Sequence, residues 1–74
     1  MMLKSNTLKT AVTIENVPEY ANTVPYIVAR LDDHTKKFWF YGAWDKESEA
    51  ERVAGELGDC AFVFENEAAL EGNK

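Results

Sequence analysis

The sequence has almost none of the residues that build disulfides, metal sites and catalytic triads. Its 74 residues include one cysteine, Cys60, and one histidine, His34. A single cysteine cannot form an internal disulfide, and the two residues together are too few for a structural zinc site. His34 is expected at an exposed turn and Cys60 in the core, so no nucleophile is expected beside a base. We predict no enzyme activity, no catalytic residues, and no metal or cofactor.

Long apolar runs, glycine-rich loops and clustered positive charge are also missing. No segment approaches the roughly 20 apolar residues of a membrane span, and the N-terminus lacks a signal-peptide pattern, so we expect a cytoplasmic protein without membrane contact. The four glycines are scattered and match no phosphate-binding loop. The net charge of −5 argues against direct binding of nucleic acid, which requires clustered Lys and Arg.

The chain does contain enough apolar and aromatic residues, 46% and 12%, for one small core. We expect a single domain over 1–74, with 1–7 and 67–74 loose or frayed. Alternating apolar residues predict strands, and Asp45 is expected to cap an amphipathic helix. The predicted strands are 8–17, 25–31, 37–44 and 60–65, and the predicted helix is 46–57. The fold class is therefore a small α+β domain of β-β-β-α-β order, with one mostly antiparallel sheet and a single helix on one face.

The second and third strands are predicted to form a hairpin with Asp33-His34 at its tip. This register places Ala29 opposite Phe38 and Arg30 opposite Lys37, a mild conflict of like charges. One face of the hairpin then carries Ile27, Ala29, Leu31, Phe38 and Phe40. The other face carries Tyr26, Val28, Arg30, Lys37, Trp39 and Tyr41. The helix is predicted to bury a stripe of Ala50, Val53, Ala54 and Leu57 and to end at Gly58.

The second hairpin face is the predicted partner-binding surface. A single helix covers one face of a sheet, whereas this hairpin has large rings on both. Exposed Trp and Tyr side chains are typical of interface centres. The candidate residues are Tyr26, Val28, Arg30, Trp39 and Tyr41. Three explanations stay open. The chain covers this face with its own N-terminal segment or tail, or with Trp44 and the loop before Pro25; two copies associate into a homodimer; or a dedicated partner or small ligand binds.

The helix provides a second candidate surface of a different kind. Its acidic residues Glu47, Glu51 and Glu56 are consistent with a decoy or inhibitor that occupies a basic groove of a nucleic-acid-binding host protein. A solvated helix face explains the same residues. Asp32-Asp33 are interpreted as turn residues, because the spaced oxygen ligands and glycine of a calcium loop are absent.

The run Tyr41-Gly42-Ala43-Trp44-Asp45, the charged helix after it and the closing strand 60–65 resemble small proteins encoded in phages and prophages of Gram-positive bacteria. The resemblance covers roughly residues 26–66. It implies an accessory protein of unknown function that binds a host or phage protein, and it assigns no role to any residue.

Overall fold

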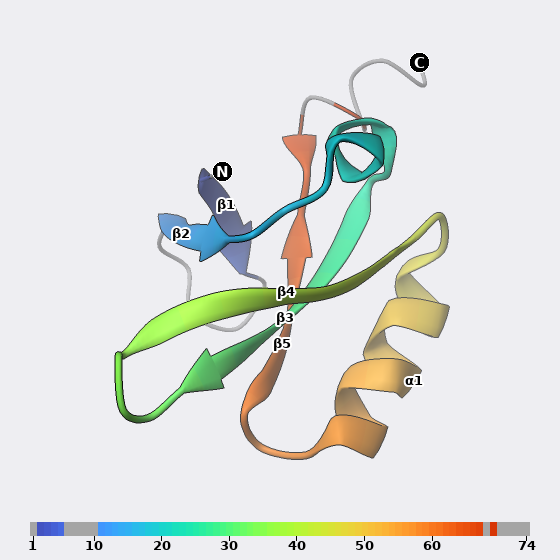
Figure 1. The fold of residues 1–74 in the computed structure, drawn as a ribbon. Coiled ribbons are helices and arrows are strands. Elements are labelled where there is room, and N and C mark those ends of the chain that lie inside the picture. Colours follow the sequence, from blue (N-terminus) through green and yellow to red (C-terminus); the bar gives the residue numbers. More distant parts are fainter. Residues whose placement is uncertain (1, 6–10, 68, 70–74) are drawn as a thin grey trace.

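In a computed structural model of the chain, residues 2–5, 11–67 and 69 are described, and their strands form one closed barrel (Figure 1). The elements are β1 (Met2–Ser5), β2 (Ala11–Glu15), the 3-10 helix η1 (Glu19–Thr23), β3 (Tyr26–Asp32), β4 (Lys37–Trp44), α1 (Glu47–Leu57) and β5 (Ala61–Glu65). The strand order is β1-β2-β4-β3-β5, closed by pairing of β1 with β5. Strands β2 and β4 are parallel and the other pairs antiparallel. The predicted α+β class is confirmed.

The barrel interior is filled by alternate residues of its strands. Ile14, Ile27 and Phe64 are buried there, each from a different strand. Phe38 meets Phe64 and Phe62 edge to face, at centroid distances of 5.4 and 5.7 Å, which is a favoured geometry for aromatic pairs. The same buried cluster also contains Leu3, Ala21 and Ala29. The inner hairpin face was thus predicted correctly as apolar and is covered by the barrel itself.

Helix α1 packs outside the barrel, against β3 and β5 (Figure 1). Val28 is 0% exposed and forms a second buried cluster with Ala50 and Ala54. The predicted helix stripe is therefore confirmed for Ala50, Ala54 and Leu57 but not for Val53, which is outside this cluster. The sheet face that the helix covers was predicted wrongly. Because β1, β2 and η1 close the barrel over Ile27 and its neighbours, the outer face that contains Val28 is the one left for the helix.

The N-terminal region differs from its prediction. Met2–Ser5, expected to be loose, forms β1 and pairs with both β2 and β5. Of the predicted first strand 8–17, residues 8–10 lie outside the described part, and β2 ends at Glu15 because Asn16 takes a positive φ of 61°. The tail was expected to be loose or frayed after one helical turn from Asn66, and in agreement with such a turn the Ala69 N–H donates to the Asn66 carbonyl at 3.1 Å and Ala69 is 8% exposed.

The β3–β4 hairpin has a longer turn than predicted. A four-residue turn over 33–36 replaces the two-residue tip, with Lys36 at a φ of 59° and its N–H donating to the Asp32 carbonyl at 2.7 Å. The register therefore shifts by two residues, so that Asp32 opposes Lys37 and Arg30 opposes Trp39. The predicted conflict between Arg30 and Lys37 was wrong. A shift of two keeps every side chain on its predicted face near the turn.

The ends of α1 and the strand that follows it complete the fold. Lys46, rather than the predicted Asp45, occupies the N-cap position, without a side-chain cap. Gly58 ends the helix as predicted, with a φ of 105° and its N–H donating to the Ala54 carbonyl at 3.2 Å. Val53 of the predicted stripe is half-buried. Strand β5 runs parallel to β4, as is usual when a helix connects two strands of one sheet, and lies between β3 and β1.

Candidate functional site

The structure divides the predicted partner-binding residues into two groups. Val28 is fully buried and Tyr26 half-buried, both in the cluster that α1 and Trp44 cover. Trp39 and Tyr41 are 41% and 49% exposed, and Arg30 is also exposed. The chain therefore covers one half of this face itself, through Trp44, which was among the expected covers, and through α1, which was not. The other half remains open to solvent.

Trp39 lies at the centre of a row of side chains contributed by three neighbouring strands. On β4 it stands between Glu15 of the parallel strand β2 and Arg30 of the antiparallel strand β3. Residues at paired positions point to the same side of a sheet, and neighbouring strands are about 4.8 Å apart. The row Glu15–Trp39–Arg30 thus places an acidic and a basic side chain about 10 Å apart, on either side of an exposed indole.

A β-bulge on β4 lies close to Trp39, at Tyr41. Ala29 pairs with Phe40 and Val28 with Gly42, so Tyr41 is an extra residue on β4 without a partner of its own on β3. A bulge bends its strand and redirects side chains, and such features are common beside functional sites. The glycine at position 42, inside a strand, was the signal in the sequence for this irregularity.

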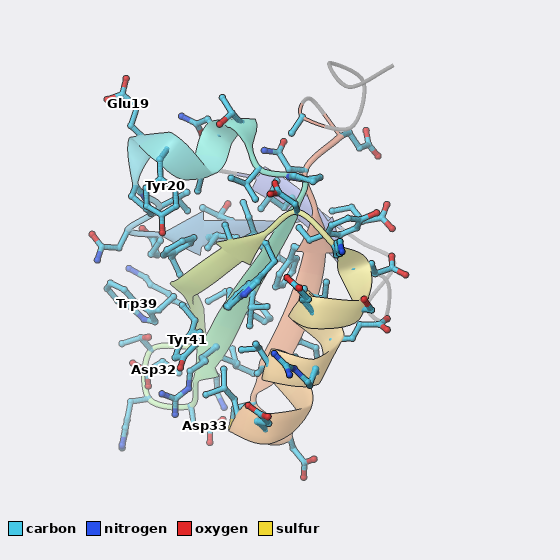
Figure 2. The ribbon with its side chains drawn as sticks, turned by 90° about the vertical axis from the view of Figure 1, so that its right-hand side faces the viewer. Glu19, Tyr20, Asp32, Asp33, Trp39 and Tyr41 are labelled. Atoms are coloured by element: carbon cyan, nitrogen blue, oxygen red, sulfur yellow. The ribbon has the colours of Figure 1, made fainter. Side chains whose placement is uncertain are left out.

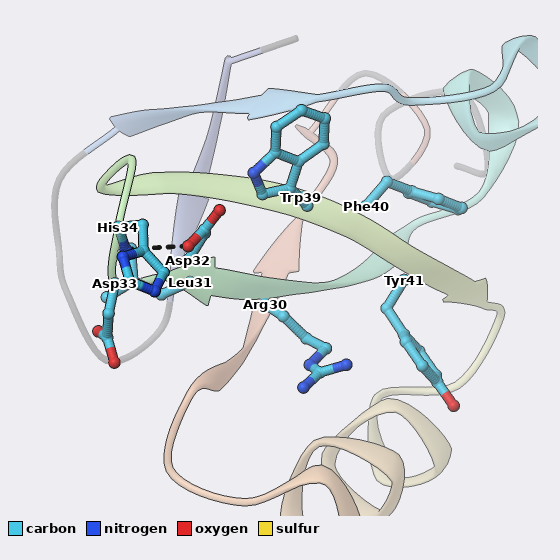
Figure 3. Close-up of a pocket in the computed structure, with 8 residues that line it drawn as sticks. All are labelled: Arg30, Leu31, Asp32, Asp33, His34, Trp39, Phe40 and Tyr41. Atoms are coloured by element: carbon cyan, nitrogen blue, oxygen red, sulfur yellow. Dashed lines mark hydrogen bonds between the residues drawn. The ribbon is translucent and has the colours of Figure 1, made fainter.

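An open pocket of about 490 Å³ lies beside Trp39, at the turn end of the hairpin (Figure 3). It is lined by residues 30–34 and 39–41. In Figure 3, Trp39 leans toward β2, whereas Arg30 and Tyr41 project to the other side of the β4 ribbon. The Asp32 carboxylate accepts the His34 N–H at 2.9 Å, and this backbone hydrogen bond lowers the pKa of Asp32. The turn is therefore fixed locally, as the Asp-rich sequence predicted.

Tyr20 is a further exposed ring that the sequence analysis missed. It is 61% exposed on η1, and its ring meets Phe40 of β4 edge to face at 6.3 Å. Figure 2 shows Tyr20, Trp39 and Tyr41 on one side of the molecule and α1 toward the other. The segment after Pro18 looked like an ordinary loop, and the contact with β4 depends on closure of the barrel. We call Glu15, Tyr20, Arg30, Trp39 and Tyr41 the Trp39 surface.

Among the other chemistry-bearing residues, Asp32, Asp33 and His34 line the pocket beside this surface. His34 is exposed, as predicted. Cys60 is also exposed, so its predicted place in the core was wrong; β5 begins one residue later, at Ala61. On α1, Glu51 and Glu56 are exposed and Glu47 is half-buried. Within 2–5, 11–67 and 69, no three His, Cys, Asp or Glu side chains gather as metal ligands would.

No protein-family model matches the chain, and comparisons with curated proteins and with solved structures also gave no match. The resemblance to small phage and prophage proteins stays a prediction. Among the described residues, no helix is both long enough and apolar enough to cross a membrane.

Proposed function

We propose that this chain is a small protein-interaction module that binds its partner through the Trp39 surface. The observation that carries the proposal is the exposure of Trp39, at 41%, in the middle of a strand whose inward neighbours fill the core. Trp and Tyr are enriched at the centres of interfaces, and Arg is the third residue typical of binding hot spots. Arg30, Trp39 and Tyr41 supply all three.

The surface also has the layout of an interface. The exposed Trp39 ring lies between the charged residues Glu15 and Arg30, which matches an apolar centre with a polar rim. The closed barrel beneath keeps the strands fixed, so little conformational freedom is lost on binding. The Tyr41 bulge belongs to the same rigid support.

The test is capture of a partner from host lysate by immobilised variants. We expect Trp39→Ala and Tyr41→Ala to keep the parent's far-UV circular dichroism and to lose a protein that the parent captures. Truncating a hot-spot ring costs about 2 kcal/mol, or roughly thirtyfold in affinity. Glu51→Gln is the matched control, because Glu51 is exposed on α1. This variant should capture the same protein as the parent.

The same experiment separates the acidic-decoy alternative. If the carboxylates of α1 carried the function, joint replacement of Glu47, Glu51 and Glu56 by Gln would abolish capture while Trp39→Ala would retain it. That pattern would reject the Trp39 surface as the binding site. Binding through the helix carboxylates would also weaken steeply as salt rises.

A small ligand is the second candidate occupant, because the pocket beside Trp39 has a volume within the range of small-molecule sites. It would use the same rings, so Trp39→Ala would again remove binding. The two occupants differ in what the immobilised parent retains: a protein band for an interaction module, and a small molecule detectable by mass spectrometry for a ligand-binding domain.

A further inference from the structure

We propose that the partner at the Trp39 surface is a second copy of this chain, and that the two copies pair face to face about a two-fold axis that runs along β4. The inference rests on the proposed function, since it names the partner of that same surface. Its basis is the order of charges in the row Glu15–Trp39–Arg30, which is acidic on one side of the indole and basic on the other.

This charge order is complementary to itself under one rotation. A two-fold axis along β4 and through Trp39 exchanges the β2 side of one copy with the β3 side of the other. Glu15 of each copy then faces Arg30 of its partner, and the two Trp39 rings, each leaning toward its own β2, pass side by side at the axis. The two Lys37 side chains also approach each other along β4, each beside Asp32 at the paired position of its own β3. A two-fold interface uses the same patch on both subunits, so a patch of this kind must be complementary to itself.

The charges nearest to Trp39 also favour a second copy over a strongly charged partner. Four charged residues on this outer face, Glu15, Arg30, Asp32 and Lys37, come from paired positions on β2, β3 and β4. Two are acidic and two are basic, so these four paired positions carry no net charge although the chain carries −5 and the acidic Asp33 lines the neighbouring pocket. Copies of an acidic chain repel one another least where the surface is neutral.

Glu15 and Arg30 are available for contacts between copies. Arg30 is exposed, Glu15 is half-buried, and neither forms an ion pair with another described side chain. The exposed ring area, on the order of 100 Å² for each of Tyr20, Trp39 and Tyr41, gives a small interface. Interfaces at the low end of the size range bind weakly. We therefore expect the dimer to be weak.

The test is a charge swap followed by sedimentation equilibrium, with reductant present because Cys60 is exposed. Glu15→Arg alone places Arg opposite Arg in the dimer, and Arg30→Glu alone places Glu opposite Glu. Each variant should associate at least tenfold more weakly than the parent. Mixed together, the two variants should form a heterodimer about as stable as the parent dimer, because both contacts then join opposite charges.

The matched controls are Glu51→Arg and Arg52→Glu on α1, which change the net charge by the same amounts at exposed positions away from the Trp39 surface. Each should associate like the parent, alone and mixed. Failure of the mixed variants to associate would overturn the proposed pairing, as would a parent that stays monomeric at 1 mM. If the parent is monomeric but capture of another protein still requires Trp39, the interaction module stands and the second copy is rejected.

Discussion

The indole ring of Trp44 lies directly over Gly42 on β4. A Cβ at position 42 would come within 2.5 Å of Cη2 and 2.8 Å of Cζ3 of Trp44, well inside the usual 3.5 to 4.0 Å carbon separation. Trp44 belongs to the cluster beneath α1, so its ring cannot move without disturbing the packing around Val28. Glycine is required at position 42 to admit this ring.

Gly42→Ala should therefore destabilise the fold by about 1 to 3 kcal/mol, the usual cost of overpacking. Gly55→Ala is the matched control, because a Cβ at position 55 would meet no atom within 4 Å and alanine favours the helix. It should stabilise by about 0.5 to 1 kcal/mol. Urea unfolding of both variants measures the difference. Equal stabilities would show that the Trp44 ring is not held over Gly42.

Asn66 joins the end of β5 to η1. Its side chain is 2% exposed, and Nδ2 lies 3.0 Å from the Asn22 carbonyl and 3.3 Å from the Val24 carbonyl. A longer contact of 3.4 Å reaches the carbonyl of Ala21, and the Asn66 N–H donates to the Pro25 carbonyl at 2.8 Å. One buried amide thus satisfies the carbonyls of the turn that covers the end of the barrel.

Asn66→Asp should destabilise the protein by about 3 kcal/mol or more at pH 7, because a buried carboxylate would face carbonyl oxygens. This environment raises the pKa of the new carboxyl, so the loss should grow as pH rises above about 3.9 and shrink in acid, where the protonated group donates. Asn66→Ala should cost about 1 to 3 kcal/mol without that dependence. Thermal melts at several pH values test both. Parallel pH curves for the two variants would contradict the buried environment of Asn66.

Asp32 gives the hairpin turn a pH dependence of the opposite sign. The His34 N–H that it accepts holds its pKa below the ordinary value of 3.8. A carboxyl with a lowered pKa stabilises the fold above the ordinary value and loses that contribution as pH falls through the lowered one.

Asp32→Asn retains an acceptor oxygen that does not titrate. Between about pH 5 and pH 2, the melting temperature of the parent should fall relative to that of Asp32→Asn, with the difference developing below the ordinary pKa. The measurement is a series of calorimetric melts. A constant difference over this range would show that the hydrogen bond to His34 does not favour the ionised form.

The sequence predicted the elements whose signals are local. Alternation in β3, β4 and β5 assigned Ile27, Phe38 and Phe64 to one face, and helical spacing found Ala50 and Ala54. These assignments hold because side-chain direction follows from backbone geometry alone.

Closure of the barrel could not be predicted in the same way. It depends on pairing between Met2–Ser5 and Ala61–Glu65, which are far apart in the chain, and four residues carry too little periodicity to identify a strand. Which residues of the predicted partner-binding site are exposed depends on this closure. The alternating pattern assigns Val28 and Trp39 to the same face. Only the position of α1 decides that Val28 is buried in the core and Trp39 is exposed on the surface.

The central claim is that one hairpin face is divided between the core and a binding surface. The most direct measurement is the free energy of unfolding of Trp39→Ala beside that of Val28→Ala. Val28→Ala should lose about 2 kcal/mol, because the side chain is fully buried beneath α1. Trp39→Ala should lose about 1 kcal/mol or less, although it removes more atoms. A loss for Trp39→Ala equal to or greater than that for Val28→Ala would place Trp39 in the core and contradict the account.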